Sequence, residues 1–364
     1  MTCGVGDHAM RLAGELRRRG HEAAIFTRAP AAANPEAPEI PVESVPGGPI
    51  AIAHGIAERV LAFGCTDAII EYTAQMWGAS RFGSAALPLL AARLEQAGVS
   101  VSLALHELYT DWSWRPDLLV GSALLRLQLC ALIAACDRVF VTTQSRQALI
   151  AGPVAALAPP PAVAVMRIGP NALPVESRAP GGHRIGLFST LALGKRFDVA
   201  LAAFEEIAAA FPDAELHLIG DIGASPRRTA LEQTIAASPA GRRVHLTGKL
   251  SLPEVAATVA DLDLYFFIMD TGANTRSGTL PVALGAGVPV VAIRGAETDP
   301  LFVHGDNVFL ADGLEGPAFA RAARQLFADP ALAAQIGEGG ARLYREHLSW
   351  ACIADSLLET LGPS

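Results

Sequence analysis

The stretch DTGANTRSGTLPVALGAGVPVV, residues 270–291, decides the fold of this chain. An apolar run at 262–269 precedes it, and a second run, PVVAI at 289–293, overlaps its end. Both runs are typical of buried parallel strands. Between them, residues 270–279 are small and polar, and apolar residues then recur at helical spacing from Leu280. The predicted order is strand, loop, short helix and strand, which is the repeating unit of a parallel α/β sheet.

The loop at 270–279 has the composition of a phosphate-binding turn. A loop of this kind leaves backbone N–H groups unpaired at the start of the following helix, and such groups bind anions. Arg276 adds a fixed positive charge inside the loop. An ordinary strand-to-helix turn would have the same residues, and the pattern leaves both interpretations open.

Length and composition limit the classes of protein to consider. A chain of 364 residues predicts two domains, and its 51 % of apolar residues can fill two cores. The net charge of −8 argues against a nucleic-acid partner. No apolar segment is long enough for a membrane span, and the N-terminus has no secretory signal. Five cysteines without metal-binding spacing predict reduced thiols in a cytoplasmic protein.

The rest of the second half repeats the alternation of strand and helix. Lys195 and Arg196 follow its first predicted strand, in the loop that enters the next helix. Because this loop and the loop at 270–279 both follow strands, we expect them at the same end of the sheet. The two cations and the loop could then clamp a diphosphate. Two exposed loop cations without a ligand are the alternative. We expect strands at 183–190, 214–221 and 244–250, and helices at 196–210, 227–237, 252–259, 315–327, 330–346 and 349–361.

In the first half, the strand VSLALHE (101–107) has His106 and Glu107 at its carboxyl end. Ligands of open α/β sheets bind at the carboxyl ends of strands, which makes His106 a candidate catalytic residue, although a structural histidine is the common alternative. We expect further strands at 22–27, 67–73 and 137–143, and helices at 51–63, 85–97 and 120–135.

The chain begins with a glycine pattern. GVGDHA at 4–9 fits G-x-G-x-x-G/A, and a helix is expected to follow it. Such a loop normally follows a strand, but only three residues precede Gly4. Either the fold lacks this first strand or the true start codon lies upstream, and we expect the upstream start codon. With Arg28 at the end of the next strand, the pattern also leaves an NADP-dependent oxidoreductase open.

Taken together, these residues resemble the retaining glycosyltransferases of family four. The resemblance covers nearly the whole chain, and SGTLPVALGAGVPVVA at 277–292 is its most specific part. Further matching segments are GVGDHAMRLAGELRRRGHE at the start, LALHELY around His106, GLFSTLALGKRFDVALAAF at 186–204, LHLIGD at 216–221, HLTGKLSLPEVAATVADLDLYFF at 245–267 and VHGDNVFL at 303–310.

The resemblance implies the GT-B fold, an α/β architecture of two Rossmann-like parallel-sheet domains that face each other across a cleft. We place an acceptor-side domain at 1–168. Its boundary lies within a Pro- and Gly-rich connector at 158–182. A nucleotide-sugar-binding domain follows at 169–346. A C-terminal helix at 347–364 is expected to pack back toward the first domain.

The same resemblance implies roles for individual residues. His106 matches the histidine beside the transferred sugar. The remaining matches concern the donor: Lys195 and Arg196 as the basic pair for its diphosphate, the amides of Gly278 and Thr279 at a helix N-terminus, the backbone of Lys249 and Leu250 at the nucleobase, and Gly4 and Gly6 near the donor phosphate or the acceptor. From the loop at 270–279 itself, we add Gly272 and Arg276 as donor-binding residues.

One departure from the family stands out. The family usually has two glutamates eight positions apart, one facing the sugar and one the ribose, and the matching positions here are Asn274 and Val282. Asn274 could still hydrogen-bond a sugar hydroxyl, whereas Val282 cannot hold a ribose as a glutamate does.

The implied reaction is metal-independent transfer of a sugar from a nucleoside-diphosphate sugar to an acceptor hydroxyl, with retention of configuration. The donor is a substrate, and no cofactor is expected. The acceptor would be a glycan, a lipid-linked sugar or a small metabolite. The loss of both glutamates leaves a second hypothesis open, a non-catalytic or partner-dependent homologue that binds sugar nucleotides. An epimerase of similar two-domain shape has no support from individual residues.

Overall fold

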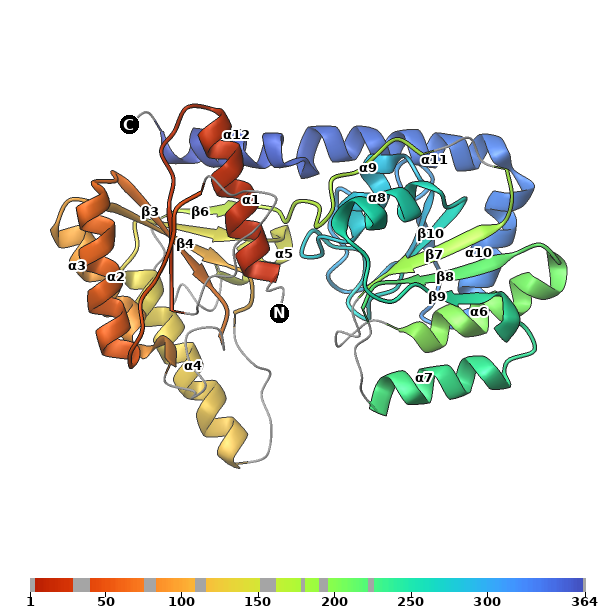
Figure 1. The fold of residues 1–364 in the computed structure, drawn as a ribbon, viewed down its shortest axis with the longest axis horizontal. Coiled ribbons are helices and arrows are strands. Elements are labelled where there is room, and N and C mark those ends of the chain that lie inside the picture. The colour runs from red at the N-terminus through yellow and green to blue at the C-terminus, as the bar shows by residue number, and fades with distance from the viewer. Residues whose placement is uncertain are drawn as a thin grey trace. The chain divides into compact units, whose positions relative to one another are not determined.

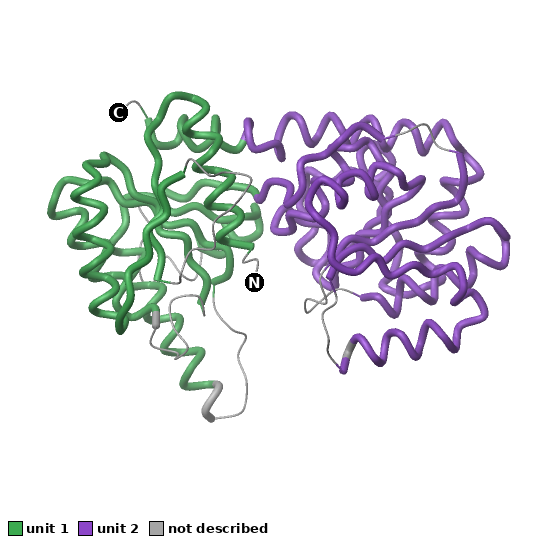
Figure 2. Tube along the Cα trace, in the orientation of Figure 1, with its two compact units in different colours: residues 1–167, 353–364 green, residues 168–352 purple. Residues whose placement is uncertain are grey.

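Two groups of residues form separate units in a computed structural model of the chain. Unit 1 comprises residues 1–167 and 353–364, and unit 2 comprises residues 168–352 (Figure 2). Both are built around parallel strands, which confirms the predicted α/β class. The structure describes residues 4–28, 40–74, 83–108, 116–150, 162–177, 181–189, 196–221 and 226–362.

Unit 2 contains a sheet of six parallel strands in the order β12-β11-β10-β7-β8-β9. The stretch at 270–291 connects two of its neighbouring strands, since β10 pairs directly with β11. The strands are β7 (Arg184–Phe188), β8 (Glu215–Ile219), β9 (Val244–Leu246), β10 (Leu264–Phe267), β11 (Val290–Ile293) and β12 (Phe309–Ala311). The helices are α6 (Phe197–Ala210), α7 (Pro226–Ala237), α8 (Leu252–Ala260), α9 (Leu280–Ala286), α10 (Gly316–Ala328) and α11 (Pro330–Leu343), and α11 runs into a π-helical turn at Tyr344–Leu348.

Helices cover both faces of this sheet, because its strands are apolar on both faces. Figure 1 shows α8 and α9 on one side of the strands and α6 on the other. Along β7, Ile185 and Leu187 belong to a core formed with α6 and α10, while Phe188 belongs to a second core with α8 and α9. This double cover leaves the carboxyl ends of the strands, and the loops that follow them, as the place where ligands can approach.

Unit 1 has a four-stranded parallel sheet, β3-β4-β5-β6, and a separate parallel pair, β1-β2. The strands are β1 (Ile25–Thr27), β2 (Val42–Ser44), β3 (Asp67–Tyr72), β4 (Ser100–Leu105), β5 (Arg138–Val141) and β6 (Val163–Val165). The helices are α1 (Gly4–Arg18), α2 (Pro49–Phe63), α3 (Leu87–Gln96), α4 (Pro116–Ala134) and α5 (Gln144–Leu149). The apolar core of unit 1 includes buried residues of α2, α3, α4 and the four-stranded sheet.

The predicted glycine loop at 4–9 is wrong, because α1 begins at Gly4 and both Gly4 and Gly6 lie inside it. Asp7 in the first turn suits the helix dipole. His8, Leu12 and Glu15 are buried at spacings of three and four residues, so one face of the helix packs from its first turns onward.

The C-terminal helix α12 (Trp350–Leu361) crosses the boundary between the units. Its residues up to Cys352 belong to unit 2, and its residues from Ile353 onward belong to unit 1. Within unit 2, the indole Nε1 of Trp350 donates to the Pro170 carbonyl at 3.1 Å. Within unit 1, Arg19 Nε donates to Asp355 Oδ1 at 2.9 Å, and Arg138 Nη2 donates to the Leu361 carbonyl at 3.0 Å. Among the described residues, no helix has both the length and the hydropathy that a membrane span requires.

Candidate functional site

His106 lies directly beyond the carboxyl end of β4, and its imidazole is held by a carboxylate from the neighbouring strand. Its backbone N–H donates to the Tyr72 carbonyl at 3.0 Å and so extends the pairing of β3 with β4. The imidazole Nε2–H donates to Glu71 Oε2 at 2.5 Å. Sequence reasoning identified His106 but missed Glu71, because nothing in the spacing of the two residues indicates that their strands are neighbours.

A second histidine completes this cluster, which we call the histidine–glutamate cluster (His8, Glu71, His106). His8 comes from α1, with Nε2 at 3.8 Å from Glu71 Oε1. Its ring meets the His106 ring edge to face, with centroids 4.9 Å apart. His8 is 2 % exposed. The residue of the GVGDHA segment that joins this cluster is its histidine, whereas the sequence analysis singled out the glycines.

Burial and mutual charge set the protonation of this cluster. Burial lowers the pKa of His8 to about 4, and the neighbouring His106 acts in the same direction while the Glu71 carboxylate opposes it. Burial alone would raise the pKa of Glu71, but His8, His106 and the hydrogen bond from His106 together hold it below its usual value. Near neutral pH, the cluster therefore contains an ionised Glu71 and a neutral His8.

Arg146 fixes the backbone that carries His106. It lies in α5, whose N-cap Thr143 accepts from the Arg146 backbone N–H at 3.2 Å. The guanidinium donates through Nη1 to the His106 carbonyl and through Nη2 to Glu107 Oε2 at 2.9 Å. Arg146 is 8 % exposed, so these contacts hold residues 106 and 107 from inside the unit. Sequence reasoning did not single out this arginine.

In unit 2, Arg196 from the segment between β7 and α6 contacts the start of the predicted loop at 270–279. Arg196, at the start of α6, pairs with Asp198 (Nη2 to Oδ2, 2.7 Å) and with Asp270 (Nη1 to Oδ1, 3.5 Å). The hydrogen bond from Arg196 also lowers the pKa of Asp198. Lys195 lies outside the described residues. The expected cation is thus present at this edge, and in this structure its partners are carboxylates.

The side chain of Asn274 forms hydrogen bonds within the loop at 270–279. It is fully buried, and its amide Nδ2 donates to Thr271 Oγ1 and to the Gly272 carbonyl, both at 3.2 Å. Its Oδ1 accepts from the Arg276 N–H at 3.2 Å. The expectation that Asn274 contacts a sugar hydroxyl therefore does not fit this arrangement, because the side chain is enclosed and its polar atoms are used within the loop.

Gly272 allows this loop to pass close to the next one. Its φ of 104° lies in the region that favours glycine, and a Cβ there would overlap Thr298 and Gly295 of the loop after β11. Arg276 bridges the same two loops, since its Nη1 donates to Glu297 Oε2 at 2.8 Å. Its side chain is 19 % exposed and that of Glu297 33 %. Glu297 is a carboxylate that sequence reasoning missed.

The N-terminus of α9 is enclosed. Gly278 and Thr279 are buried, and the Gly278 carbonyl accepts from the Asn171 N–H at 2.8 Å. Val282 is fully buried in the core beneath α9. The position that matches the family's ribose-facing glutamate therefore offers no contact to a donor here, because the Val282 side chain faces apolar neighbours.

Lys249 and Leu250 lie in the turn between β9 and α8, at the carboxyl end of β9 as predicted. Lys249 is exposed and Leu250 is half-buried. A bridge between Gly220 and Gly248 ties this turn to the end of β8, and Gly248 has a φ of 68° that favours glycine. The backbone of the turn is thus held in place where a ligand could approach it.

Within the part of the chain that the structure describes, two groups of side chains have the composition of a metal site, although the sequence showed no metal-ligand spacing. One is the histidine–glutamate cluster of unit 1, and the other is Glu215, His217 and His245 of unit 2. In the first, His106 and Glu71 are bonded directly at 2.5 Å. Two ligands of one zinc ion lie about 3.3 Å apart, so the first group would have to open to hold one.

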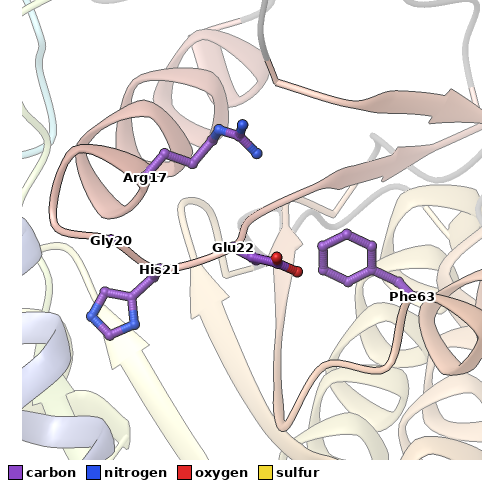
Figure 3. Close-up of a pocket in the computed structure, with 5 residues that line it drawn as sticks. All are labelled: Arg17, Gly20, His21, Glu22 and Phe63. Carbon is purple, nitrogen blue, oxygen red and sulfur yellow. The ribbon is translucent and has the colours of Figure 1, made fainter.

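A pocket of about 340 Å³ lies at the far end of α1. Arg17, Gly20, His21, Glu22 and Phe63 line it (Figure 3). Arg17 is nine residues from His8, which corresponds to about 13 Å along a helix. The pocket is therefore separate from the histidine–glutamate cluster and contains none of the predicted site residues.

Both units match families of known proteins. Residues 2–152 match the family described as Glycosyltransferase Family 4, and residues 182–329 match Glycosyl transferases group 1. A GDP-mannose-dependent alpha-(1-6)-phosphatidylinositol monomannoside mannosyltransferase of Mycolicibacterium smegmatis is 28 % identical over 299 residues, which is 77 % of this chain and 75 % of that protein.

Solved structures with the same fold include a sucrose-phosphate synthase and a protein in complex with UDP-glucose. Sucrose-phosphate synthase from Thermosynechococcus elongatus superposes with a TM-score of 0.73 at 18 % identity, covering 96 % of this chain and 91 % of that one. Anabaena HepE, solved with UDP-glucose, gives a TM-score of 0.74 at 19 % identity and covers 99 % and 96 % of the two chains.

Proposed function

Because this chain belongs to the glycosyltransferases of the GT-B fold, we propose that it transfers a sugar from a nucleoside diphosphate to the hydroxyl group of an acceptor. The observation that carries this proposal is the position of His106. It lies at the carboxyl end of a parallel strand, where ligands of such sheets bind, and Glu71 and Arg146 fix its ring and its backbone. The NADP-dependent oxidoreductase is set aside, since residues 4–9 are helical and both units match glycosyltransferase families.

The proposed donor is a nucleoside-diphosphate hexose. The mannosyltransferase relative is named as GDP-mannose-dependent, and HepE was solved with UDP-glucose, which makes these two sugars the first candidates. We assign the donor diphosphate to the end of the unit 2 sheet where Arg196 and Arg276 lie. Each arginine pairs with a carboxylate there, so a diphosphate would bind by exchanging one anionic partner for another.

The chemical barrier lies in separating the anionic diphosphate from an oxocarbenium-like sugar. Fixed positive groups stabilise the leaving diphosphate as its charge develops, each by up to a few kcal/mol. In this proposal, Lys195, Arg196 and Arg276 neutralise the leaving group without a metal ion. Retention of configuration follows the resemblance to family four.

His106 positions the sugar rather than attacking it. Its Nε2–H is committed to Glu71, so in the neutral ring Nδ1 has a lone pair that can accept a hydrogen bond from a hydroxyl of the sugar or acceptor. Arg146 is a positioning residue, since it reaches the reacting groups only through the backbone of residues 106 and 107.

A second candidate function is favoured by Asn274 and Val282. Their side chains are fully buried, so neither offers a ligand a group in place of the two missing glutamates. This supports a homologue that binds sugar nucleotides but depends on a partner for turnover, or does not turn over at all.

Donor consumption and donor binding, measured together, test the two functions. The enzyme should release a nucleoside diphosphate from GDP-mannose or UDP-glucose, with slow hydrolysis as the reaction when no acceptor is present. His106→Ala should lower this rate by about 10²- to 10⁴-fold and leave the Kd of the diphosphate unchanged. Arg276→Ala should weaken binding, and Arg228→Ala on the exposed face of α7 is the matched control.

Three outcomes separate the candidates. A lower rate with unchanged diphosphate binding in His106→Ala, together with weaker diphosphate binding in Arg276→Ala, supports the transferase. Binding of a diphosphate without consumption of any donor supports the partner-dependent homologue. A rate that is the same in wild type and His106→Ala would remove His106 from the mechanism.

A further inference from the structure

A group of three side chains on the sheet of unit 2 is unrelated to the proposed donor site. Glu215 and His217 lie two residues apart on β8 and therefore point to the same face. His245 on β9 is the direct partner of His217 in the strand register, so its side chain also points to that face. The three ligand-type groups come from two hydrogen-bonded strands, whose backbones fix their spacing.

The distances within this group fit a single small cation. Glu215 Oε2 lies 3.3 Å from His217 Nε2, and Glu215 Oε1 lies 3.7 Å from His245 Nε2. The nitrogen and oxygen ligands of a tetrahedral zinc ion stand about 2.0–2.2 Å from the metal and therefore about 3.3 Å from one another. A zinc ion would need only small side-chain movements here, in contrast to the histidine–glutamate cluster of unit 1.

The electrostatics also favour a cation. Glu215 brings a carboxylate to two imidazole nitrogens, and zinc takes carboxylate and imidazole ligands of this kind in proteins. Asp261 acts on His217 as a further nearby negative charge, although Arg184 pairs with Asp261 at 2.6 Å. The side chains of Glu215 and His245 are 42 % and 45 % exposed, which leaves room for a water ligand.

We propose that Glu215, His217 and His245 form a zinc site that ties the edge strand β9 to β8. β9 has three residues and a single neighbour in the sheet, so few hydrogen bonds hold it. The turn that carries Lys249 and Leu250 follows directly after it. A metal ion bound across β8 and β9 stabilises this edge, and it does so whether or not the chain transfers sugars.

Calorimetric titration of ZnCl₂ into the metal-free full chain at pH 7 tests the proposal. Wild type is compared with His217→Asn and His245→Asn, each of which should weaken zinc binding by about 100-fold, since even an outer-shell contact is worth 10- to 100-fold. Two matched variants control for zinc bound elsewhere. His183→Asn removes a half-exposed histidine that has its own carboxylate partner in unit 2, and His106→Asn disables the cluster in unit 1.

The expected result is one zinc ion whose affinity falls in His217→Asn and His245→Asn and stays within about twofold of wild type in both controls. Metal-free melting curves establish that the variants fold. Hydrogen exchange at residues 244–248 gives a second measurement, because zinc should slow exchange there in wild type but not in His245→Asn. The proposal is overturned if wild type binds no zinc at 100-fold excess, or if the affinity is the same in wild type and both ligand variants.

Discussion

Acid should destabilise unit 1 through His8. The pKa of this side chain is about 4 in the folded chain, against its ordinary value of 6.5. Between these two pH values, the unfolded chain holds a proton at His8 that the folded chain does not. Stability therefore falls as the pH decreases from 6.5 toward 4, and above 6.5 this contribution is constant.

The size of the effect follows from the burial of His8. A difference from 6.5 to about 4 corresponds to about 3 kcal/mol, because a tenfold change in proton affinity is worth about 1.36 kcal/mol. His8 is 2 % exposed, so solvent screening does not reduce this figure. About 2 kcal/mol of the loss should fall between pH 7 and pH 5. The lowered pKa of Glu71 gives a loss of the same sign, but only at a pH near or below the ordinary carboxyl value of 4.5.

The assay is urea unfolding of wild type and His8→Gln at pH 7, 6 and 5, with the difference between the two taken at each pH. Titrating groups outside the histidine–glutamate cluster cancel in this difference. Wild type should lose about 2 kcal/mol relative to His8→Gln between pH 7 and pH 5. If both proteins show the same pH dependence, the reasoning about the buried His8 and its cluster is refuted.

Three further predictions concern unit 2. Asp270→Asn removes one of the carboxylates that pair with Arg196. Diphosphate binding measured by calorimetry should tighten by up to about fivefold, since exposed ion pairs are worth about 0–1 kcal/mol. Weaker binding would contradict this prediction. Val282→Glu restores a family glutamate but buries a carboxylate in an apolar core, so denaturant unfolding should show a loss of several kcal/mol and donor affinity should not improve. Gly278→Ala would bring a methyl group into the Asn171 side chain, and the free energy of unfolding should fall by about 1–3 kcal/mol, whereas an unchanged Tm would refute the close packing of α9.

Most of the architecture could be predicted from the sequence, because the alternation of buried strands with amphipathic helices is a local pattern. The stretch at 270–291 is the clearest case, since β10, α9 and β11 all occur where its composition changes. Short strands were either missed or predicted to be longer than they are. β12 has three residues and no periodicity of its own, and β9 ends at Leu246 although the segment predicted as a strand extends to Leu250.

The candidate site was predictable only in part, because its contacts join distant segments. His106 was identified by its place at the end of a strand, but Glu71 and Arg146 come from other elements, and no spacing links them to it. Asn274 was misjudged because residue type does not reveal which way a side chain points. The glycines of GVGDHA fit a loop motif, yet the buried face beginning at His8 makes this segment helical.

The most direct test of the central claim is a thermal-shift screen against UDP, GDP, ADP, CDP, TDP and NADP. A ligand at about 100 times its Kd stabilises the fold by roughly 2.7 kcal/mol, which a melting curve detects easily. We predict a clear rise in Tm with one of the nucleoside diphosphates and loss of this rise in Arg276→Ala. A rise with NADP alone would contradict the assignment of this chain as a sugar-nucleotide-dependent transferase.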